Sequence, residues 1–304
     1  MTFKKLTWIE KIRLKFTDAQ SYEFYKFSLK EEKFRLDAQN LRPVNLDHLY
    51  KIETRFKHSG NAGDIIYSLP AVFALAKNGT AHLYLNTNQV VKYPFYHPLG
   101  NVMLNDKMLE MLKPLLLFQP MIKECDKYDG QAVDYDLDLF RTQPFHLNKG
   151  SITRWYCHIF GIYPDTSQPW LTAPKNESMR DFIVIARTHR YRSPGINYSF
   201  LHKYGKIIFL GLPIEYQDLK KELPELIYHP VNDFLETASI INGCRLFIGN
   251  QSFAFALAEG LKVNRLLEIY FEAPNVIPEG KGAHDFVYQP HFEKAVDMLY
   301  NSSQ

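Results

Sequence analysis

A short polar segment near residue 60 combines two glycines with a carboxylate. It reads SGNAGD and contains Ser59, Gly60, Asn61, Gly63 and Asp64, followed by an apolar run. The glycines allow a tight turn whose backbone N–H groups lie at a helix N-terminus. A carboxylate there can remove a proton from a hydroxyl group, or it can cap the helix and interact with its dipole. The segment lacks the remaining residues of a Walker loop and of a dinucleotide fingerprint, so neither motif assigns it a function. Both roles, proton acceptor and helix cap, therefore stay open for Asp64.

Three arginines follow a strand-like apolar run in the second half of the chain. They are Arg187, Arg190 and Arg192 in IARTHRYRSPG. Guanidinium groups bind phosphate oxygens with two parallel hydrogen bonds, so this cluster predicts a diphosphate site. The alternative is a solvated basic loop. His189, between the arginines, is more typical of a loop histidine than of a general acid.

Two further helix starts in the second half carry polar residues. Glu215 follows a strand-like run and a glycine, where a carboxylate can accept hydrogen bonds from ribose, or can simply be an N-terminal helix residue. Asn250, Gln251 and Ser252 precede the next apolar helix. Their donors can bind a phosphate at the helix N-terminus, and the alternative is an ordinary Ser or Asn cap.

The pattern around these residues predicts two α/β units. Strand-like runs alternate with helix-like runs, which is typical of parallel sheets with crossover helices. The predicted strands are 54–59, 81–86 and 135–140 in the first half, and 181–188, 206–213, 225–230 and 245–250 in the second. Ligands of such sheets bind beyond the carboxyl ends of the strands, where the polar residues described above are found.

The chain divides into four predicted parts. They are an N-terminal helical extension over 1–54, Rossmann-like domains over 55–165 and 175–288, and a closing helix over 289–304. Residues 163–181 are rich in Pro, Ser, Thr and Asn, and we interpret them as the interdomain linker. Asp134, Asp136 and Asp138 alternate in DYDLDLF, and alternation favours one face of an edge strand over a metal cluster.

The composition excludes several classes of protein. The chain has 304 residues, of which 46% are hydrophobic and 23% charged, as in a globular protein of about two domains. A net charge of +3 is too small to indicate nucleic-acid binding. No apolar run is long enough to span a bilayer and no signal peptide is evident, so we expect a cytoplasmic protein. Cys125, Cys157 and Cys244 are widely spaced and indicate core thiols rather than disulfides or a zinc site.

The first predicted helix is unusually basic. Lys4, Lys5, Lys11, Arg13 and Lys15 lie among aromatic and aliphatic residues. This composition suits a helix that lies on an anionic membrane, so peripheral contact with the inner membrane face is one expectation. The commoner alternative is a solvated basic face on a helix that packs on the body of the protein.

Three motifs give the chain a resemblance to GT-B glycosyltransferases, and most of all to the heptosyltransferase-type family, glycosyltransferase family nine. GNAGDIIYSLPAVFAL resembles the family's Gly-Asp before an apolar helix with proline, and FLGLPIE resembles its Gly-x-Pro-x-Glu. LFIGNQSFAFALAEGL resembles its Gly-Asn-Asp-Ser-Gly-Pro-x-His segment. The order and spacing of the motifs, over about residues 55 to 300, make the case. The resemblance implies two doubly wound Rossmann-like domains that face a cleft.

The resemblance also implies a reaction: inverting transfer of a sugar from a nucleotide-diphosphate-sugar to the hydroxyl of a glycan, lipid-linked or small-molecule acceptor, without a metal or other cofactor. By this resemblance Asp64 is the catalytic base in an acceptor-side domain, and its loop of Ser59, Gly60, Asn61 and Gly63 lets the acceptor approach. In the second, nucleotide-sugar-binding domain, Glu215 holds the ribose, Ser252 lies with Asn250 and Gln251 at the donor phosphates, and the three arginines belong to the cationic diphosphate region.

The chain departs from the family pattern at the third motif. Gln251 stands where the family has aspartate, and the segment lacks the family's Gly-Pro and histidine. The identities of the sugar and the nucleotide therefore do not transfer. Two alternatives stay open, because a fold does not fix a function. One is a nucleotide-sugar epimerase or hydrolase, and the other is a non-catalytic nucleotide-binding module.

Overall fold

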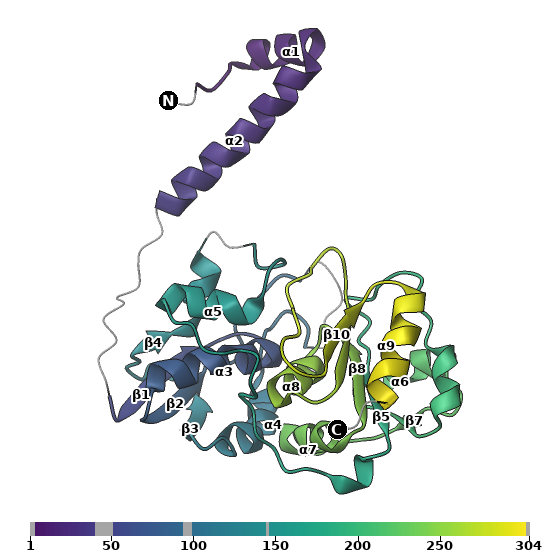
Figure 1. Ribbon diagram of the computed structural model, residues 1–304. Coiled ribbons are helices and arrows are strands. Elements are labelled where there is room, and N and C mark those ends of the chain that lie inside the picture. Colours follow the sequence, from purple (N-terminus) through teal and green to yellow (C-terminus); the bar gives the residue numbers. More distant parts are fainter. Residues whose placement is uncertain (1–3, 40–50, 94–98, 144–145, 302–304) are drawn as a thin grey trace.

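Two helices at the N-terminus stand apart from the rest of the molecule (Figure 1). The computed structural model describes residues 4–39, 51–93, 99–143 and 146–301. Helix α1 (Trp8–Thr17) begins with a capping box, in which Glu10 accepts from Thr7 N at 2.7 Å and Thr7 Oγ1 accepts from Glu10 N at 3.3 Å. Helix α2 (Ala19–Gln39) follows directly. Residues 1–3 and 40–50 of the predicted extension lie outside the described residues.

The first sheet has four parallel strands in the order β3-β2-β1-β4. The strands are β1 (Glu53–His58), β2 (Thr80–Leu85), β3 (Ile122–Lys127) and β4 (Tyr135–Asp136), and the helices are α3 (Ala62–Ala76), α4 (Asp106–Leu117) and α5 (Ile152–Phe160). Burial alternates along β1, so that Thr54, Phe56 and His58 point into the protein. This alternation matches a sheet with one face on the core. It places His58, the last residue of β1, on the buried face at the carboxyl end of the strand.

The second sheet has six parallel strands in the order β10-β9-β8-β5-β6-β7. The strands are β5 (Ile183–Ala186), β6 (Ile207–Phe209), β7 (Ile227–Tyr228), β8 (Leu246–Asn250), β9 (Arg265–Glu268) and β10 (Ala283–Phe286), and the helices are α6 (Pro213–Leu219), α7 (Phe234–Gly243), α8 (Phe253–Leu261) and α9 (Gln289–Asn301). All four residues of β5 are buried, and they divide between two apolar clusters on opposite faces. The strand order reverses between β5 and β8, which is where such sheets bind ligands. The predicted fold class is therefore confirmed.

Three strands were not predicted, and one predicted strand is mostly something else. Four of the six residues of β3 are charged, and β9 and β10 have four residues each with charged or His side chains among them, so the three strands show little apolar periodicity. The predicted strand 135–140 is wrong beyond Asp136, because Leu137–Thr142 forms the 3-10 helix η1. Asp136 accepts a hydrogen bond from Asp138 N at 3.0 Å, and this local bond starts the turn.

The alternating aspartates are each paired with a cation. Asp134 binds Lys51, and Asp136 accepts from Lys57 at 2.7 Å. Because of η1, Asp138 does not continue the face of the strand. Within the described part of the chain, no group of three or more His, Cys, Asp and Glu side chains is arranged to hold a metal ion.

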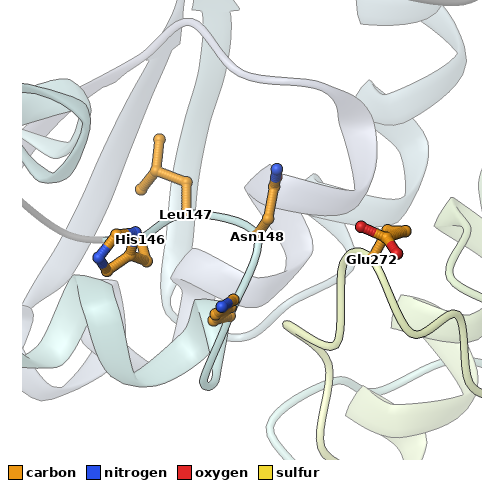
Figure 2. Close-up of a pocket in the computed structure, with 5 residues that line it drawn as sticks. His146, Leu147, Asn148 and Glu272 are labelled. Atoms are coloured by element: carbon orange, nitrogen blue, oxygen red, sulfur yellow. The ribbon is translucent and has the colours of Figure 1, made fainter. Parts of the chain in front are cut away.

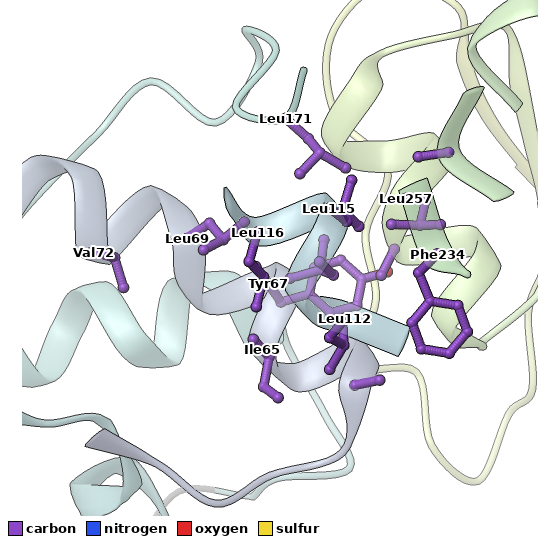
Figure 3. Close-up of a cluster of buried hydrophobic side chains, with 14 of the residues drawn as sticks. Ile65, Tyr67, Leu69, Val72, Leu112, Leu115, Leu116, Leu171, Phe234 and Leu257 are labelled. Carbon is purple, nitrogen blue, oxygen red and sulfur yellow. The ribbon is translucent and has the colours of Figure 1, made fainter. Parts of the chain in front are cut away.

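The two sheet-containing domains share one apolar core (Figure 3). Tyr67 of α3 and Leu115 of α4 lie against Phe234 of α7 and Leu257 of α8, and all four are buried. The N-termini of α3 and α8 also meet, because a Cβ atom at Gly63 would lie 3.6 Å from the Cα atom of Phe253. The ends of two helices from different domains thus form a common boundary.

The three cysteines are buried free thiols, as predicted. Burial raises the pKa of Cys125 and of Cys244 to about 12, and that of Cys157 to about 11. Such thiols stay protonated at neutral pH and are poor nucleophiles. In the described residues, no helix is both long enough and apolar enough to cross a membrane.

Candidate active site

Asp64 lies in the first turn of α3 and has two partners. Its Oδ2 atom accepts from Asn61 N at 3.3 Å and from Arg141 Nη2 at 2.9 Å. The carboxylate therefore caps the helix, which is one of the two roles predicted for it. Its side chain still keeps 21% of its surface exposed, so a small molecule can reach it. The two predicted roles are thus compatible in one residue.

Arg141 connects Asp64 to a second carboxylate. Arg141 Nη1 donates to Asp138 Oδ1 at 2.6 Å, and Asp138 also accepts from Ser59 N at 3.0 Å and from Ser59 Oγ at 2.6 Å. Burial tends to lower the pKa of Arg141, but Tyr156, Asp64 and Asp138 raise it, so it stays charged. The sequence pattern did not single out Arg141, although Arg141 directly follows the predicted strand 135–140. The rule applied to the other strand ends would have found it.

The neutral ring of His58 holds the turn before α3 by a hydrogen bond to the backbone. Its Nδ1 atom accepts from Gly60 N at 2.8 Å, and its Nε2 atom lies 2.8 Å from the hydroxyl of Tyr156. Burial lowers the pKa of His58 to about 3, so the ring is neutral and Nε2 carries the proton. A Cβ atom at Gly60 would lie 2.4 Å from Arg141 Nη2 and 2.5 Å from the ring of His58, so only glycine fits there.

His58 should make the protein less stable in mild acid. The unfolded chain takes up a proton on this histidine near its usual pKa of 6.5, whereas the folded protein does so only near 3. The free energy of unfolding therefore falls as the pH falls through this window, by about 2 kcal/mol between pH 7 and pH 5 from this group alone. Urea unfolding of the wild type and of His58→Asn at pH 7 and pH 5 measures it. A variant that loses as much stability as the wild type over this interval would contradict the assignment.

Arg187 has a different partner from the predicted phosphate. Its Nε and Nη2 atoms donate to Glu268 at 2.7 and 2.9 Å, and the two side chains are 4% and 0% exposed. Glu268 also accepts from the hydroxyl of Tyr198 at 2.9 Å. The carboxylate comes from β9, a strand that the sequence pattern did not show. Both prongs of the Arg187 guanidinium are thereby occupied within the domain.

Arg192 is also held inside the domain, by Asp218 of α6. Its Nη1 atom donates to Asp218 Oδ2 at 2.5 Å and its Nε atom donates to Thr188 O at 2.9 Å. His189 lies 3.5 Å from the same carboxylate on an exposed part of the loop, in agreement with a loop histidine. Three arginines were predicted to bind a diphosphate. Two of them, Arg187 and Arg192, form ion pairs within the second domain and hold the loop 187–192 in place.

Arg190 is the arginine of this loop that approaches the first domain. Its guanidinium lies 5.4 Å from the ring centre of Tyr191, and its positive charge acts to lower the pKa of Tyr93. Tyr93 belongs to the first domain and donates to Asn61 Oδ1 at 2.8 Å. Burial and Asp64 raise the pKa of Tyr93, whereas Asn61 and Arg190 lower it. Asp64 and Arg190 thus both act electrostatically on Tyr93, which places their two loops near each other at the boundary.

The side chain of Asn250 holds the arginine loop, residues 187–192, by hydrogen bonds to its backbone. Its side chain is fully buried at the end of β8, where Oδ1 accepts from Thr188 N at 2.9 Å and Nδ2 donates to Arg190 O at 2.6 Å and Tyr191 O at 3.2 Å. Tyr191 has φ of 55°, a left-handed conformation that is strained for a tyrosine. Asn250 thus holds this conformation by hydrogen bonds to the backbone and does not point its amide at an open site.

Two predicted donor-site residues act as helix caps. Ser252 Oγ accepts from Phe255 N at 3.3 Å at the start of α8. Glu215 Oε2 accepts from Leu212 N at 3.1 Å at the start of α6. The alternative roles given by the sequence are therefore present in the structure, and the hydroxyl hydrogen of Ser252 stays available as a donor.

Gln251 joins the start of α8 to a hollow between the domains. Its Nε2 atom donates to Ala273 O at 2.6 Å and to the side chain of Asn275, which in turn donates to Leu147 O at 2.7 Å. Figure 2 shows the hollow, which has a volume of ≈ 450 Å³. Its lining residues are His146, Leu147, Asn148 and Lys149 of the first domain and Glu272 of the second.

Each of the two Rossmann-like domains has a parallel sheet, and the ligand-binding edges of the two sheets meet at one boundary. This arrangement defines a GT-B fold. The same fold is found in solved heptosyltransferases, although the sequence identities are low. The glycosyl transferase of family 9 from Veillonella parvula has a TM-score of 0.52 and 14% identity, with 86% of this chain and 92% of that chain covered. The E. coli ADP-heptose lipopolysaccharide heptosyltransferase II has a TM-score of 0.55 and 12% identity, with 82% and 98% covered.

A third similar structure was solved with an ADP-linked sugar. The E. coli heptosyltransferase WaaC with ADP-2-deoxy-2-fluoro heptose has a TM-score of 0.52 and 10% identity, with 77% of this chain and 92% of that chain covered. No protein-family model matches the chain. No curated protein matches it either. The likeness therefore lies in the fold, and the site residues must be argued from their own geometry.

Proposed function

We propose that the protein is a glycosyltransferase that moves a sugar from a nucleotide-diphosphate-sugar to an acceptor hydroxyl, with inversion and without a metal ion. The observation that carries this proposal is the position of Asp64. It is a partly exposed carboxylate at the N-terminus of α3, where that helix meets the N-terminus of α8 from the other domain. A base on one side and a helix N-terminus on the other suit attack on a sugar whose leaving group is a diphosphate.

The proposed mechanism divides the work between the two domains. Asp64 removes the proton of the acceptor hydroxyl, and the hydrogen bond from Arg141 orients its carboxylate. The hydroxyl oxygen attacks the anomeric carbon from the face opposite the leaving group, which inverts the configuration. The N-terminus of α8 and Arg190 then stabilise the negative charge on the nucleoside diphosphate. Arg187, Arg192 and Asn250 serve this site by holding the arginine loop in place.

We propose an ADP-activated sugar as the first donor to test. Support comes from the WaaC structures, which contain ADP and ADP-2-deoxy-2-fluoro heptose. In this proposal the oxygen of Glu215 that does not cap α6 accepts from the ribose, and the hollow beside Leu147 admits the acceptor. Both domains line this hollow, and hydrogen bonds through Asn275 and Gln251 connect it to the start of α8.

The test is release of nucleoside diphosphate in the presence and absence of acceptors. Purified protein is incubated with ADP-, UDP- and GDP-sugars and with mixtures of glycan and lipid-linked acceptors, with EDTA present throughout. We expect one donor to be consumed only when an acceptor is added, and the product to have the opposite anomeric configuration by NMR. Donor consumption that needs no acceptor, or that yields a free epimer, would favour hydrolysis or epimerisation instead.

A non-catalytic nucleotide-binding module is the second candidate. The observation behind it is the pairing of Arg187 with Glu268 and of Arg192 with Asp218, which leaves fewer cations to neutralise the charge of a departing nucleoside diphosphate. A thermal-shift screen with ADP, UDP, GDP and CMP separates the two, because a ligand that binds only the folded state raises its stability. Stabilisation by a nucleotide without turnover under any acceptor condition would favour this module.

A further inference from the structure

Helix α1 presents an apolar face to solvent. Trp8 and Phe16 are 75% and 82% exposed, and Ile9 and Ile12 are exposed beside them. With a turn of about 100° per residue, these four side chains fall within one third of the helix circumference. No residue of α1 is buried. An exposed aromatic and aliphatic face of this kind is costly in water and indicates a binding surface.

The charges of α1 are arranged around that face. Residues 4–17 contain five basic residues and one acidic residue, Glu10. At the same helical spacing Arg13 flanks the apolar face on one side, Lys11 and Lys15 flank it on the other, and Glu10 lies opposite. Helix α2 has four basic and four acidic residues, so the net positive charge of these two helices lies on α1 and the residues just before it.

Helix α2 holds α1 with the apolar face outward. The hydroxyl of Tyr25 in α2 accepts from Leu6 N at 3.0 Å, and Lys11 lies 6.0 Å from the ring of Tyr25. Tyr25 is the one buried residue of α2, a helix of 21 residues and so about 31 Å long. Figure 1 shows both helices away from the two sheet-containing domains.

We propose that α1 binds in the plane of an anionic membrane surface. Trp8, Ile9, Ile12 and Phe16 enter the boundary between headgroups and acyl chains, and Lys11, Arg13 and Lys15 contact the lipid phosphates. Charge favours lipid over a second copy of this chain, because two copies of so basic a helix repel each other whereas an anionic bilayer attracts it. This proposal does not depend on the enzymatic activity.

Flotation with lipid vesicles tests the proposal on the full-length protein. We expect binding to vesicles of 70% phosphatidylcholine and 30% phosphatidylglycerol and little binding to phosphatidylcholine alone. Replacing Lys11, Arg13 and Lys15 by glutamine should weaken binding on the order of a hundredfold. Replacing Trp8 and Phe16 by serine should weaken it roughly tenfold or more.

The matched control removes the same charge from α2. The variant with Lys26, Lys30 and Lys33 replaced by glutamine should keep binding within a few-fold of the wild type, and circular dichroism should show equal helix content in every variant. Equal losses in the two charge variants would overturn the assignment to α1, as would wild-type binding that ignores lipid charge. So would a dimer in sedimentation velocity that the Trp8→Ser/Phe16→Ser variant disperses, since the face would then bind a second copy.

Discussion

Asp64→Asn should reduce sugar transfer by roughly 10²- to 10⁴-fold while leaving donor affinity within about twofold. Asparagine has nearly the same shape, and its side-chain oxygen can still accept from Asn61 N and Arg141. It cannot take a proton from the acceptor hydroxyl. The effect should therefore fall on turnover, measured as acceptor-dependent release of nucleoside diphosphate, with donor affinity measured by calorimetry.

Asp129→Asn is a matched control for this substitution. Asp129 is an exposed carboxylate on the loop after β3, and its removal should change neither turnover nor donor affinity. If Asp64→Asn kept more than a tenth of the wild-type turnover, the carboxylate would not be the base. A variant that instead lost donor binding and kept turnover at saturating donor would place Asp64 on the donor side.

Arg141→Gln is expected to affect both turnover and stability. Without the guanidinium, Asp64 and Asp138 lose their shared partner, and the negative charge of Asp138 is left largely buried. Burial tends to raise the pKa of Asp138, but this pKa is lowered in the folded protein, where hydrogen bonds from Ser59 and the charge of Arg141 stabilise the carboxylate. We expect the free energy of unfolding to fall by about 3 kcal/mol and turnover to fall by about two orders of magnitude.

A double-variant cycle distinguishes positioning of Asp64 by Arg141 from a purely structural role. Arg141→Lys keeps a positive charge beside the Asp64 carboxylate and should restore part of the turnover. The double variant of Arg141→Gln with Asp64→Asn should lose less activity than the two single losses combined. Fully additive losses in the double variant would show that Arg141 does not act through Asp64.

The sequence predicted the parts of the fold that carry strong apolar patterns. The apolar runs that became α3, α8, β5 and β8 were placed correctly because each is bounded by Gly, Pro or polar residues. The sequence missed β9, since Arg265 and Glu268 interrupt its apolar pattern. That omission changed the reading of the site as well, because Glu268 is the partner of Arg187. A charged residue in a central strand is predictable only once its buried partner is known.

The candidate site likewise has parts that the sequence predicted and parts that it missed. The sequence indicated that the segments of Asp64, Arg190 and Ser252 follow strands, and the structure brings these segments to one boundary. It did not indicate that Arg141 binds Asp64, because the two residues are 77 positions apart and only the turn of η1 brings them together. Whether these residues perform the proposed roles stays a prediction for the experiments above.

The apolar core shared by α3, α4, α7 and α8 also bears on how the chain is synthesised. When residues up to about 165 have left the ribosome, the parts of α3 and α4 that contact α7 and α8 have no cover, because Phe234 and Leu257 do not yet exist. At 5–20 residues per second, roughly five to twenty seconds pass before α8 is complete. During that interval the nascent first domain exposes an aggregation-prone surface, so we expect the chain to depend on chaperones until its second domain has emerged.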